Sequence, residues 1–281
     1  MNRSTHPGQY DWMRVLILGS TSVSYSRRYG ATNCTGGLVE GAMDLVRIFP
    51  VPRVRLSYEQ RFRAWQWVRL RATKAHDDPR PESFRIDYDS IQPEEAIPTT
   101  RAGHAQRRQL LEQSGHNCQS LEHLMDRNRE EGISLGIVRP KEIVRCRLRR
   151  KPASEQREWE DEEREILAQR EFPFDVPVMR IDYTDMEFLV EFVCDDPRCS
   201  QPHEHRVQDW GIHELYRRLH DDPERDEKVV AQMQRMLDLN RCDVFFYFGS
   251  LRGHMTNFGL MGSYSCPKTA VVQRAQGHLF E

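Results

Sequence analysis

The sequence predicts an α+β protein with two domains. Three features indicate this: short apolar or alternating segments outnumber helical patterns in the first half, a charged stretch follows at 151–171, and a compact group of cysteines and histidines comes after it. We expect a strand-rich, barrel-like or rolled-sheet domain over residues 1–150, a linker helix over 151–171, and an α+β domain stapled by zinc over 172–281. A chain of 281 residues is long enough to bury two modest cores.

Strand patterns dominate the first half. Residues 13–18 form a short apolar run typical of a buried strand, and residues 67–73 alternate between apolar side chains and basic or hydroxyl ones. Prolines end the alternating run at 45–49. The other expected strands lie at 84–88, 133–138 and 143–148, and the expected helices at 58–65, 105–113 and 120–131, the last with Ser120 as its cap.

The segment 151–171 is the expected domain boundary. It begins with Lys-Pro-Ala-Ser and then alternates acids and arginines with few apolar side chains. Glu160 and Arg164 have the spacing of a stabilising pair on one helix face. We expect a solvated connecting helix that acts as a spacer.

The second half combines strands with helices. Apolar residues alternate over 179–183 and again over 186–192, with Thr-Asp between the two runs, which predicts a hairpin. Asp209 is expected to cap one helix, and Pro223 to begin a second. The remaining expected strands lie at 244–248 and 258–264.

The most informative stretch is Cys194–His205, which reads CDDPRCSQPHEH. Two cysteines five residues apart can reach one ion across a turn, and two histidines two residues apart face the same side of an extended segment. The predicted zinc ligands are Cys194, Cys199, His203 and His205. Four protein ligands leave no position for water, so we expect a structural Zn²⁺. The alternatives are a catalytic zinc and a polar loop that binds no metal.

The sequence leaves the fourth ligand open. If one of the two histidines does not bind the ion, water or a distant side chain (His254, Cys242 or Cys266) could fill the position. A zinc that holds water would predict a metal-dependent hydrolase or nuclease with Glu204 or Glu214 as its base. No H-E-x-x-H motif and no deaminase signature occurs in the sequence.

Basic residues gather in two runs, at 53–74 and 139–151, although the net charge is only −2. Such runs can attract a nucleic acid, and they can equally be solvated faces. Trp65 and Trp67 lie beside the first run, where aromatic rings could stack on unpaired bases. The residues expected to contact nucleic acid are Arg27, Arg28, Arg53, Arg55, Arg69, Arg71 and Lys74.

These features predict a non-catalytic protein that binds DNA or RNA, as an accessory subunit of a larger nucleic-acid-processing or antiviral defence assembly. The hydrolase or nuclease is the first alternative. The second alternative is a protein-interaction adaptor that uses the charged linker.

A cytoplasmic location is expected, with no membrane partner. No apolar run approaches the roughly 20 residues that cross a bilayer. The polar stretch 1–11 lacks the pattern of a signal peptide. Seven scattered cysteines make a poor disulfide framework, which favours a reducing compartment.

Several short motifs, in their order along the chain, resemble a widespread family of uncharacterised bacterial proteins. In the first half they read SRRYG, CTGG, LVRIFPVP, DPRPES and SLGIVRPKEI. In the second half they are the C-x4-C box, Asp209-Trp with Glu214-Leu-Tyr, and FFYFG. The resemblance covers nearly the whole chain, and it implies no activity because none is established for that family.

Overall fold

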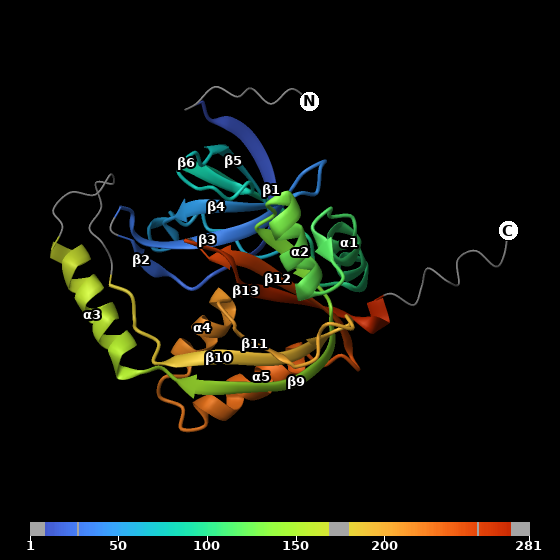
Figure 1. The fold of residues 1–281 in the computed structure, drawn as a ribbon. Helices are drawn as coiled ribbons and strands as arrows, with labels where there is room; N and C mark the ends of the chain where they lie inside the picture. The colour runs from blue at the N-terminus through green and yellow to red at the C-terminus, as the bar shows by residue number, and fades with distance from the viewer. Residues whose placement is uncertain (1–8, 27, 169–179, 252, 271–281) are drawn as a thin grey trace.

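Strands outnumber helices in this α+β fold, and they form three sheets (Figure 1). The computed structural model describes residues 9–26, 28–168, 180–251 and 253–270. Arg27, one of the predicted nucleic-acid contacts, therefore lies outside the described residues.

The first sheet contains six strands in the order β1-β5-β6-β4-β3-β2, and β1 also pairs with β3. Its strands are β1 (Asp11–Ser20), β2 (Ser24–Ser26), β3 (Gly30–Val39), β4 (Leu45–Val51), β5 (Gln66–Lys74) and β6 (Ser83–Ala96). The short 3-10 helix η1 (Arg53–Arg55) follows β4. Because β1 lies at one end of this order and also pairs with β3 near the other end, the sheet curls round on itself.

Alternation along the strands gives this sheet its core. Val15 and Ile17 of β1 lie on the same face as Val68 and Leu70 of β5, and all four side chains are buried. Ile48 of β4 packs into the same cluster. Successive side chains of a strand point to opposite faces, so Leu16 of β1 belongs to a second buried cluster on the other face, whereas Arg69 of β5 is exposed.

The second half contains a three-stranded sheet of order β11-β10-β9 and a four-stranded sheet of order β13-β12-β8-β7. The strands are β7 (Asn117–Cys118), β8 (Leu135–Val138), β9 (Pro140–Arg150), β10 (Met186–Cys194), β11 (His203–Arg206), β12 (Cys242–Leu251) and β13 (His254–Pro267). The helices are α1 (Arg101–Glu112), α2 (Leu121–Glu131), α3 (Ala153–Ala168), α4 (Trp210–Arg218) and α5 (Arg225–Met236), with the 3-10 helix η2 (Lys268–Ala270) after β13. Helix α5 packs on β9, and α2 packs on β8.

The strand pairings divide the chain at a different place from the predicted boundary after residue 150. β8 pairs with β12, and β9 pairs along its length with β10, so residues 117–150 lie in the sheets of the second half. The prediction grouped these strands with the first half because they precede the charged segment. Strand partners are set by pairing between residues far apart in the chain, which a change in composition does not reveal.

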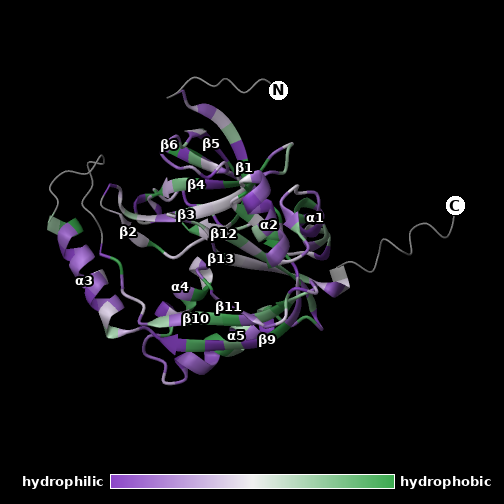
Figure 2. Cartoon of the chain, in the orientation of Figure 1, coloured by the Kyte–Doolittle hydropathy of each residue, from purple (hydrophilic) through white to green (hydrophobic). Residues whose placement is uncertain are grey.

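The charged segment 151–171 contains α3, whose surface is mostly hydrophilic (Figure 2). The helix contacts the first sheet: the rings of Trp159 and Tyr25 lie 5.0 Å apart, and the Tyr25 hydroxyl donates to Glu163 at 2.7 Å. Burial, with the nearby Glu163 carboxylate, raises the pKa of Tyr25 to about 12. The helix is therefore attached to β2 at these points and is more than a solvated spacer.

Two predicted elements differ from the structure. Residues 58–65 form turns and irregular backbone instead of a helix. Residues 180–185 carry no strand, and residue 179 lies outside the described residues. In place of the predicted hairpin, β10 pairs with β9 on one side and β11 on the other.

The two halves share a core. Leu16 and Leu38 of the first sheet pack in one cluster with Leu135, Phe245 and Tyr264 of the four-stranded sheet. Buried hydrogen bonds also cross between the halves, as between the Arg80 guanidinium and the Ser250 carbonyl at 2.8 Å. The halves therefore form one packed unit, and groups from both meet at their junction.

Candidate metal centre

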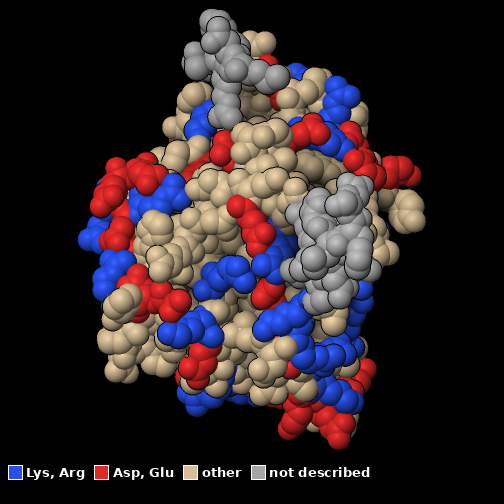
Figure 3. Space-filling model, turned by 90° about the vertical axis from the view of Figure 1, so that its right-hand side faces the viewer, with Lys and Arg blue, Asp and Glu red and all other residues tan. Residues whose placement is uncertain are grey.

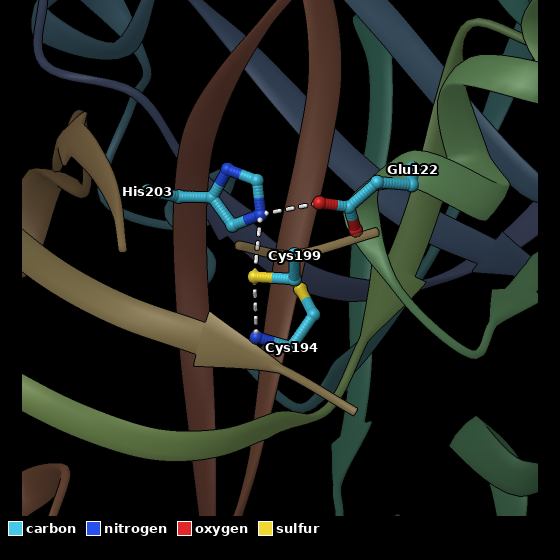
Figure 4. A group of neighbouring side chains, drawn as sticks. All are labelled: Glu122, Cys194, Cys199 and His203. Carbon is cyan, nitrogen blue, oxygen red and sulfur yellow. Dashed lines mark hydrogen bonds and ion pairs between the residues drawn. The ribbon is translucent and has the colours of Figure 1, made fainter. Parts of the chain in front are cut away.

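Four side chains from three parts of the fold meet beside the end of β10 (Figure 4). Cys194 is the last residue of β10, Cys199 lies in the turn that follows, His203 begins β11, and Glu122 lies in the first turn of α2. One ligand atom from each lies within 4.8 Å of all the others. Such a group can hold a metal ion.

The His203 ring lies between the Glu122 carboxylate and the Cys199 thiol. Its Nε2 atom lies 2.9 Å from Glu122 Oε1 and 3.3 Å from Cys199 Sγ. Both sulfur atoms also accept hydrogen bonds from the backbone: the Leu121 N–H donates to Cys194 Sγ at 3.4 Å, and the Cys194 N–H donates to Cys199 Sγ at 3.3 Å. Backbone donors of this kind stabilise negative charge on sulfur.

Asp196 holds the turn between the two cysteines. Its carboxylate accepts from the Ser120 hydroxyl at 2.7 Å, and its carbonyl accepts from the Cys199 N–H at 2.9 Å. Ser120 also caps α2, because its oxygen accepts from the His123 N–H at 2.9 Å. One hydroxyl therefore ties the helix that carries Glu122 to the turn that carries Cys199.

The predicted ligand His205 lies outside this group. It shares a face of β11 with His203, but the two ring centroids are 6.4 Å apart. Its ring packs edge-on against Phe248, and burial lowers its pKa to about 4. The prediction placed both histidines on one ion because they share a face, but the His205 ring packs against Phe248. The fourth member of the group is Glu122.

The three distant alternatives also lie elsewhere. Cys266 Sγ is 3.7 Å from the His104 carbonyl, Cys242 lies opposite Pro267 at the start of β12, and His254 is an exposed residue at the start of β13. Among the described residues, the group that can hold a metal contains none of these three.

The Glu122 carboxylate has one oxygen without a partner. Oε1 faces His203, whereas Oε2 is buried and, within the described part of the chain, accepts no hydrogen bond. Burying an unpaired carboxylate oxygen is costly. A cation held between Glu122 and the two thiols would satisfy it.

The Cys194 thiol is buried beside Leu121 and Cys199. Burial raises its pKa to about 12, with smaller contributions from Glu122 and Cys199. In the absence of a cation this thiol is therefore protonated at neutral pH. A metal ion reverses that preference because it stabilises the thiolate directly.

Sequence reasoning missed Glu122. The residue lies on a helix far from the cysteine box in the chain, two positions after the capping Ser120. An acid in the first turn of a helix is expected from the helix dipole alone. Its position therefore carried no signal of a ligand, and only the packing of α2 beside β10 brings it into the group.

The two glutamates considered as catalytic bases are engaged with arginines. Glu204 pairs with Arg147 and Arg149 on the outer side of β11. Glu214 pairs with Arg217 and Arg218 on α4, and these contacts lower its pKa. Neither belongs to the group around Cys194.

The residues predicted to contact nucleic acid differ from one another in their surroundings. Arg53 lies over Phe62 and Trp210, 5.8 and 5.4 Å from their ring centroids, and burial lowers its pKa. Lys74 lies over the ring of Phe84. These two cations therefore pack against aromatic rings of the protein itself.

The other members of that set differ in exposure. Arg55 lies in η1 and is partly buried. Arg28 is exposed and pairs with Asp77 at 3.4 Å. Arg69 and Arg71 are exposed on the outer face of β5.

An exposed aromatic ring lies beside these two arginines. Trp12 of β1 is 49% exposed, and the Arg69 guanidinium carbon lies 4.5 Å from its ring centroid. Arg71 is the register partner of Trp12 and approaches Asp87 at 3.5 Å. Arg14, next along this face, is ion-paired with Glu40, Glu94 and Glu95.

The second basic run is neutralised by acids. On β9, Arg145 and Arg147 pair with Glu191, and Arg149 pairs with Glu187 and Glu204. Figure 3 shows the same mixing, with basic and acidic side chains interspersed over the face that it presents. These arginines form a ladder of surface ion pairs, which leaves little positive charge for a nucleic acid.

Two family models match the chain. One, described as Domain of unknown function (DUF8758), matches residues 11–113, and the other, described as Domain of unknown function (DUF8757), matches residues 116–281. The boundary between the two models falls just before β7. β7 is also the first strand that pairs within the sheets of the second half. No curated protein matches the chain. None of the described helices is long and apolar enough to cross a membrane.

Proposed function

This chain belongs to the family described as Domain of unknown function (DUF8757), and we propose that it is a non-catalytic protein that binds single-stranded nucleic acid and contains a structural zinc ion. The zinc is supported by the donor atoms around Glu122. The nucleic-acid function is carried by one observation, the exposed ring of Trp12 with the Arg69 guanidinium against it.

The donor set fits Zn²⁺ better than Mg²⁺ or Ca²⁺. Two thiols and an imidazole are soft or borderline donors, whereas Mg²⁺ and Ca²⁺ prefer oxygen ligands. A carboxylate completes a set of four, which matches the tetrahedral coordination of structural zinc. A zinc ion bound there would hold α2 against the end of β10, and its charge would satisfy the buried Glu122 Oε2.

Four protein donors also favour a structural role over a catalytic one. A catalytic zinc keeps a position open for water, and all four donors of this group would occupy a tetrahedron. The carboxylates considered as bases are held by arginines instead of facing the group. These observations support a protein that binds its target without transforming it.

The Trp12 surface suits an unpaired base. An exposed indole offers a flat face for stacking, which every base can use, and an adjacent guanidinium can stack or contact phosphate. Arg71 lies opposite Trp12 on the neighbouring strand, so a second cation flanks the ring. Bases inside a duplex are already stacked on each other, so this surface favours single strands.

The ion pairs limit the electrostatic part of binding. Arg14 and the arginines of β9 are engaged with acids, and Arg71 approaches Asp87 at 3.5 Å, so Arg69 is the main cation beside Trp12. One or two phosphate contacts predict a logarithmic salt slope of about −0.7 to −1.4 for a single strand. Most of the affinity should therefore come from stacking.

The test is binding of a fluorescein-labelled oligothymidylate, measured by fluorescence anisotropy at several salt concentrations. Trp12→Ala should weaken binding by about 1–3 kcal/mol, roughly 5- to 150-fold, because it removes the stacking surface. Arg69→Ala should weaken it less and make the salt slope shallower. Tyr58→Ala is the matched control, because Tyr58 is 83% exposed but lies in the loop after η1.

Two results would contradict the nucleic-acid proposal. One is an oligothymidylate affinity that Trp12→Ala leaves unchanged while zinc content and circular dichroism match the wild type. The other is the absence of binding by the wild-type protein at low salt.

A further inference from the structure

The strand β9 forms a free edge of the three-stranded sheet. The strands of this sheet have the order β11-β10-β9, and Figure 1 shows β9 along its outer border, close to α5. β9 is 11 residues long, and among the described residues no strand pairs with the side that faces away from β10. An edge of this length presents a row of backbone N–H and C=O groups to which a further strand can bind.

The strand register shows which backbone groups face this edge. The Val207 N–H, on the β11 side of β10, donates to the Phe188 carbonyl at 2.7 Å, so the backbone groups of Phe188 point away from β9. Phe188 is the register partner of Leu148. In an antiparallel pair such residues form no hydrogen bond with each other, and their backbone groups point outward on both sides. The N–H and C=O groups of Leu148 therefore face the free edge, and those of Cys146 and Arg150 do so by the same alternation.

An open groove lies between this edge and α5. Its volume is about 350 Å³, and Leu148 of β9 lines it together with Val230 and Ala231 of α5. Two acids in the first turn of α5, Asp226 and Glu227, line the same groove. The groove therefore offers an apolar surface and negative charge to the side chains of a strand bound at β9.

The other face of β9 carries a row of arginines. The side chains of Arg145, Arg147 and Arg149 are between 31 and 57% exposed. Each bonds acids of β10 or β11 through only one or two of its nitrogens. A guanidinium has five N–H donors, so these arginines retain donors for carboxylates on a neighbouring strand.

A second copy of the chain is a poor occupant of this edge. Two β9 strands side by side would bring their arginine rows together, and like charges on facing strands are destabilising. β9 also contains a bulge at Val144, because Arg145 and Ile143 pair with the consecutive residues Glu191 and Phe192. Charged side chains and bulges are devices that keep edge strands from pairing with each other. The edge therefore favours a strand of different composition.

We propose that β9 binds an extended segment of a partner protein as an added strand, and that acidic residues of this segment alternate with aliphatic and basic ones. Backbone hydrogen bonds to the edge supply affinity, as in other cases of strand addition. The acids of the segment lie over the arginine row, its aliphatic side chains contact Leu148 and Val230 in the groove, and a lysine or arginine meets Asp226 and Glu227. No residue of this surface belongs to the metal group or to the Trp12 surface, so this proposal can fail without the others.

The test is binding of a fluorescein-labelled peptide, Glu-Val-Glu-Leu-Glu-Lys-Glu-Val, to the zinc-loaded full chain, measured by fluorescence anisotropy. Two further peptides carry N-methyl groups, one on every glutamate nitrogen and the other on every remaining residue. An added strand directs only alternate N–H groups towards β9, so one methylated peptide should bind at least about tenfold more weakly than the other. Equal affinity of the two methylated peptides, or no binding of the unmodified peptide, would overturn the proposal.

An exchange of charge tests the position of the bound strand. Glu227→Lys should weaken binding of the unmodified peptide about threefold or more, and replacing the peptide's lysine by glutamate should restore it. Glu224→Lys is the matched control, because Glu224 is 72% exposed and does not line the groove. Unchanged affinity in Glu227→Lys, or the same loss in both variants, would show that the groove beside β9 is not the binding site.

Discussion

At the scale of single residues, the candidate metal centre depends on a carboxylate with one oxygen that has no hydrogen-bond partner within the described residues. Glu122 Oε2 is buried, and its companion oxygen faces His203. The two histidines of β11 also have different surroundings. His203 lies beside the Glu122 carboxylate and the Cys199 thiol, whereas His205 packs against aromatic rings. Each difference predicts a distinct effect on zinc.

Glu122→Ala and His203→Asn should lower zinc affinity by more than the roughly 10- to 100-fold that loss of an outer-shell partner costs, because each removes a direct ligand. His205→Asn should keep one zinc per chain. Glu131→Ala on the same helix is the control, since that side chain pairs with Arg127 at the surface. Zinc content by elemental analysis and competition with a chelator measure the effect. Loss of zinc in His205→Asn with retention in Glu122→Ala would reverse the assignment.

Two partly buried histidines predict how stability depends on pH. Burial lowers the pKa of His205 and of His213 from 6.5 to about 4. Below pH 6.5 the unfolded chain binds protons that the folded chain does not, so stability is lost as pH falls from 6.5 towards 4. Each histidine contributes a slope of about 1.4 kcal/mol per pH unit in this window.

Urea unfolding of wild type and His213→Gln at pH 7 and pH 5 tests this. The variant should lose less stability between the two pH values than the wild type, because one of the two titrating groups is gone. His220→Gln is the control, since His220 is exposed. The same loss in wild type and His213→Gln would refute the assignment.

At the scale of elements, the sequence predicts helices better than strand partners. Ser120 and Asp209 were expected as caps, and their side chains accept backbone N–H groups at the starts of α2 and α4. A cap acts within one turn, so local sequence contains the information. The helix expected at 58–65 is absent: Phe62 and Trp65 pack into different clusters, and Trp65 has a positive φ of 63°, which a right-handed helix does not allow.

The strand partners and the part of Glu122 in the candidate metal group could not be predicted from short stretches of sequence. The alternation at 186–192 correctly indicates a strand, but its partner β9 lies before α3 in the chain. The cysteine box places Cys194, Cys199 and His203 close together through a short turn. Glu122 reaches them only because α2 packs beside that turn, a contact between distant segments.

The Ser120 hydroxyl should therefore affect both the stability of the fold and the affinity for zinc. Ser120→Ala removes the cap of α2 and the hydrogen bond to Asp196, so it should cost about 0.5–2 kcal/mol of stability and weaken zinc binding about tenfold or more. Thr100→Ala removes the equivalent cap of α1 and should leave zinc affinity unchanged. Urea unfolding and chelator competition separate the two effects. Equal zinc affinity in the two variants would show that the cap does not support the centre.

At the scale of the whole molecule, the charge pattern of the sequence is misleading. The basic run at 139–151 is a conspicuous feature of the linear chain, yet its arginines meet the acids of β10 and β11 across the sheet. Such pairing depends on which strands become neighbours. The Trp12 surface remains as the candidate for nucleic acid because it combines an exposed ring with exposed cations.

The two halves also depend on each other. The first sheet supplies Arg47 and Glu82, and the four-stranded sheet completes their surroundings through Ser134. The candidate metal centre lies where α2 meets the three-stranded sheet, at the end of β10. A structural zinc there would stabilise the contact on which the second half is built.

X-ray absorption at the zinc edge of the purified full chain tests the central claim most directly. We predict one zinc per chain with two sulfur neighbours at about 2.3 Å, one imidazole and one oxygen, and loss of this spectrum in Glu122→Ala. Two imidazoles would restore His205 as a ligand, and a chain that binds no zinc under any condition would contradict the account of the metal centre.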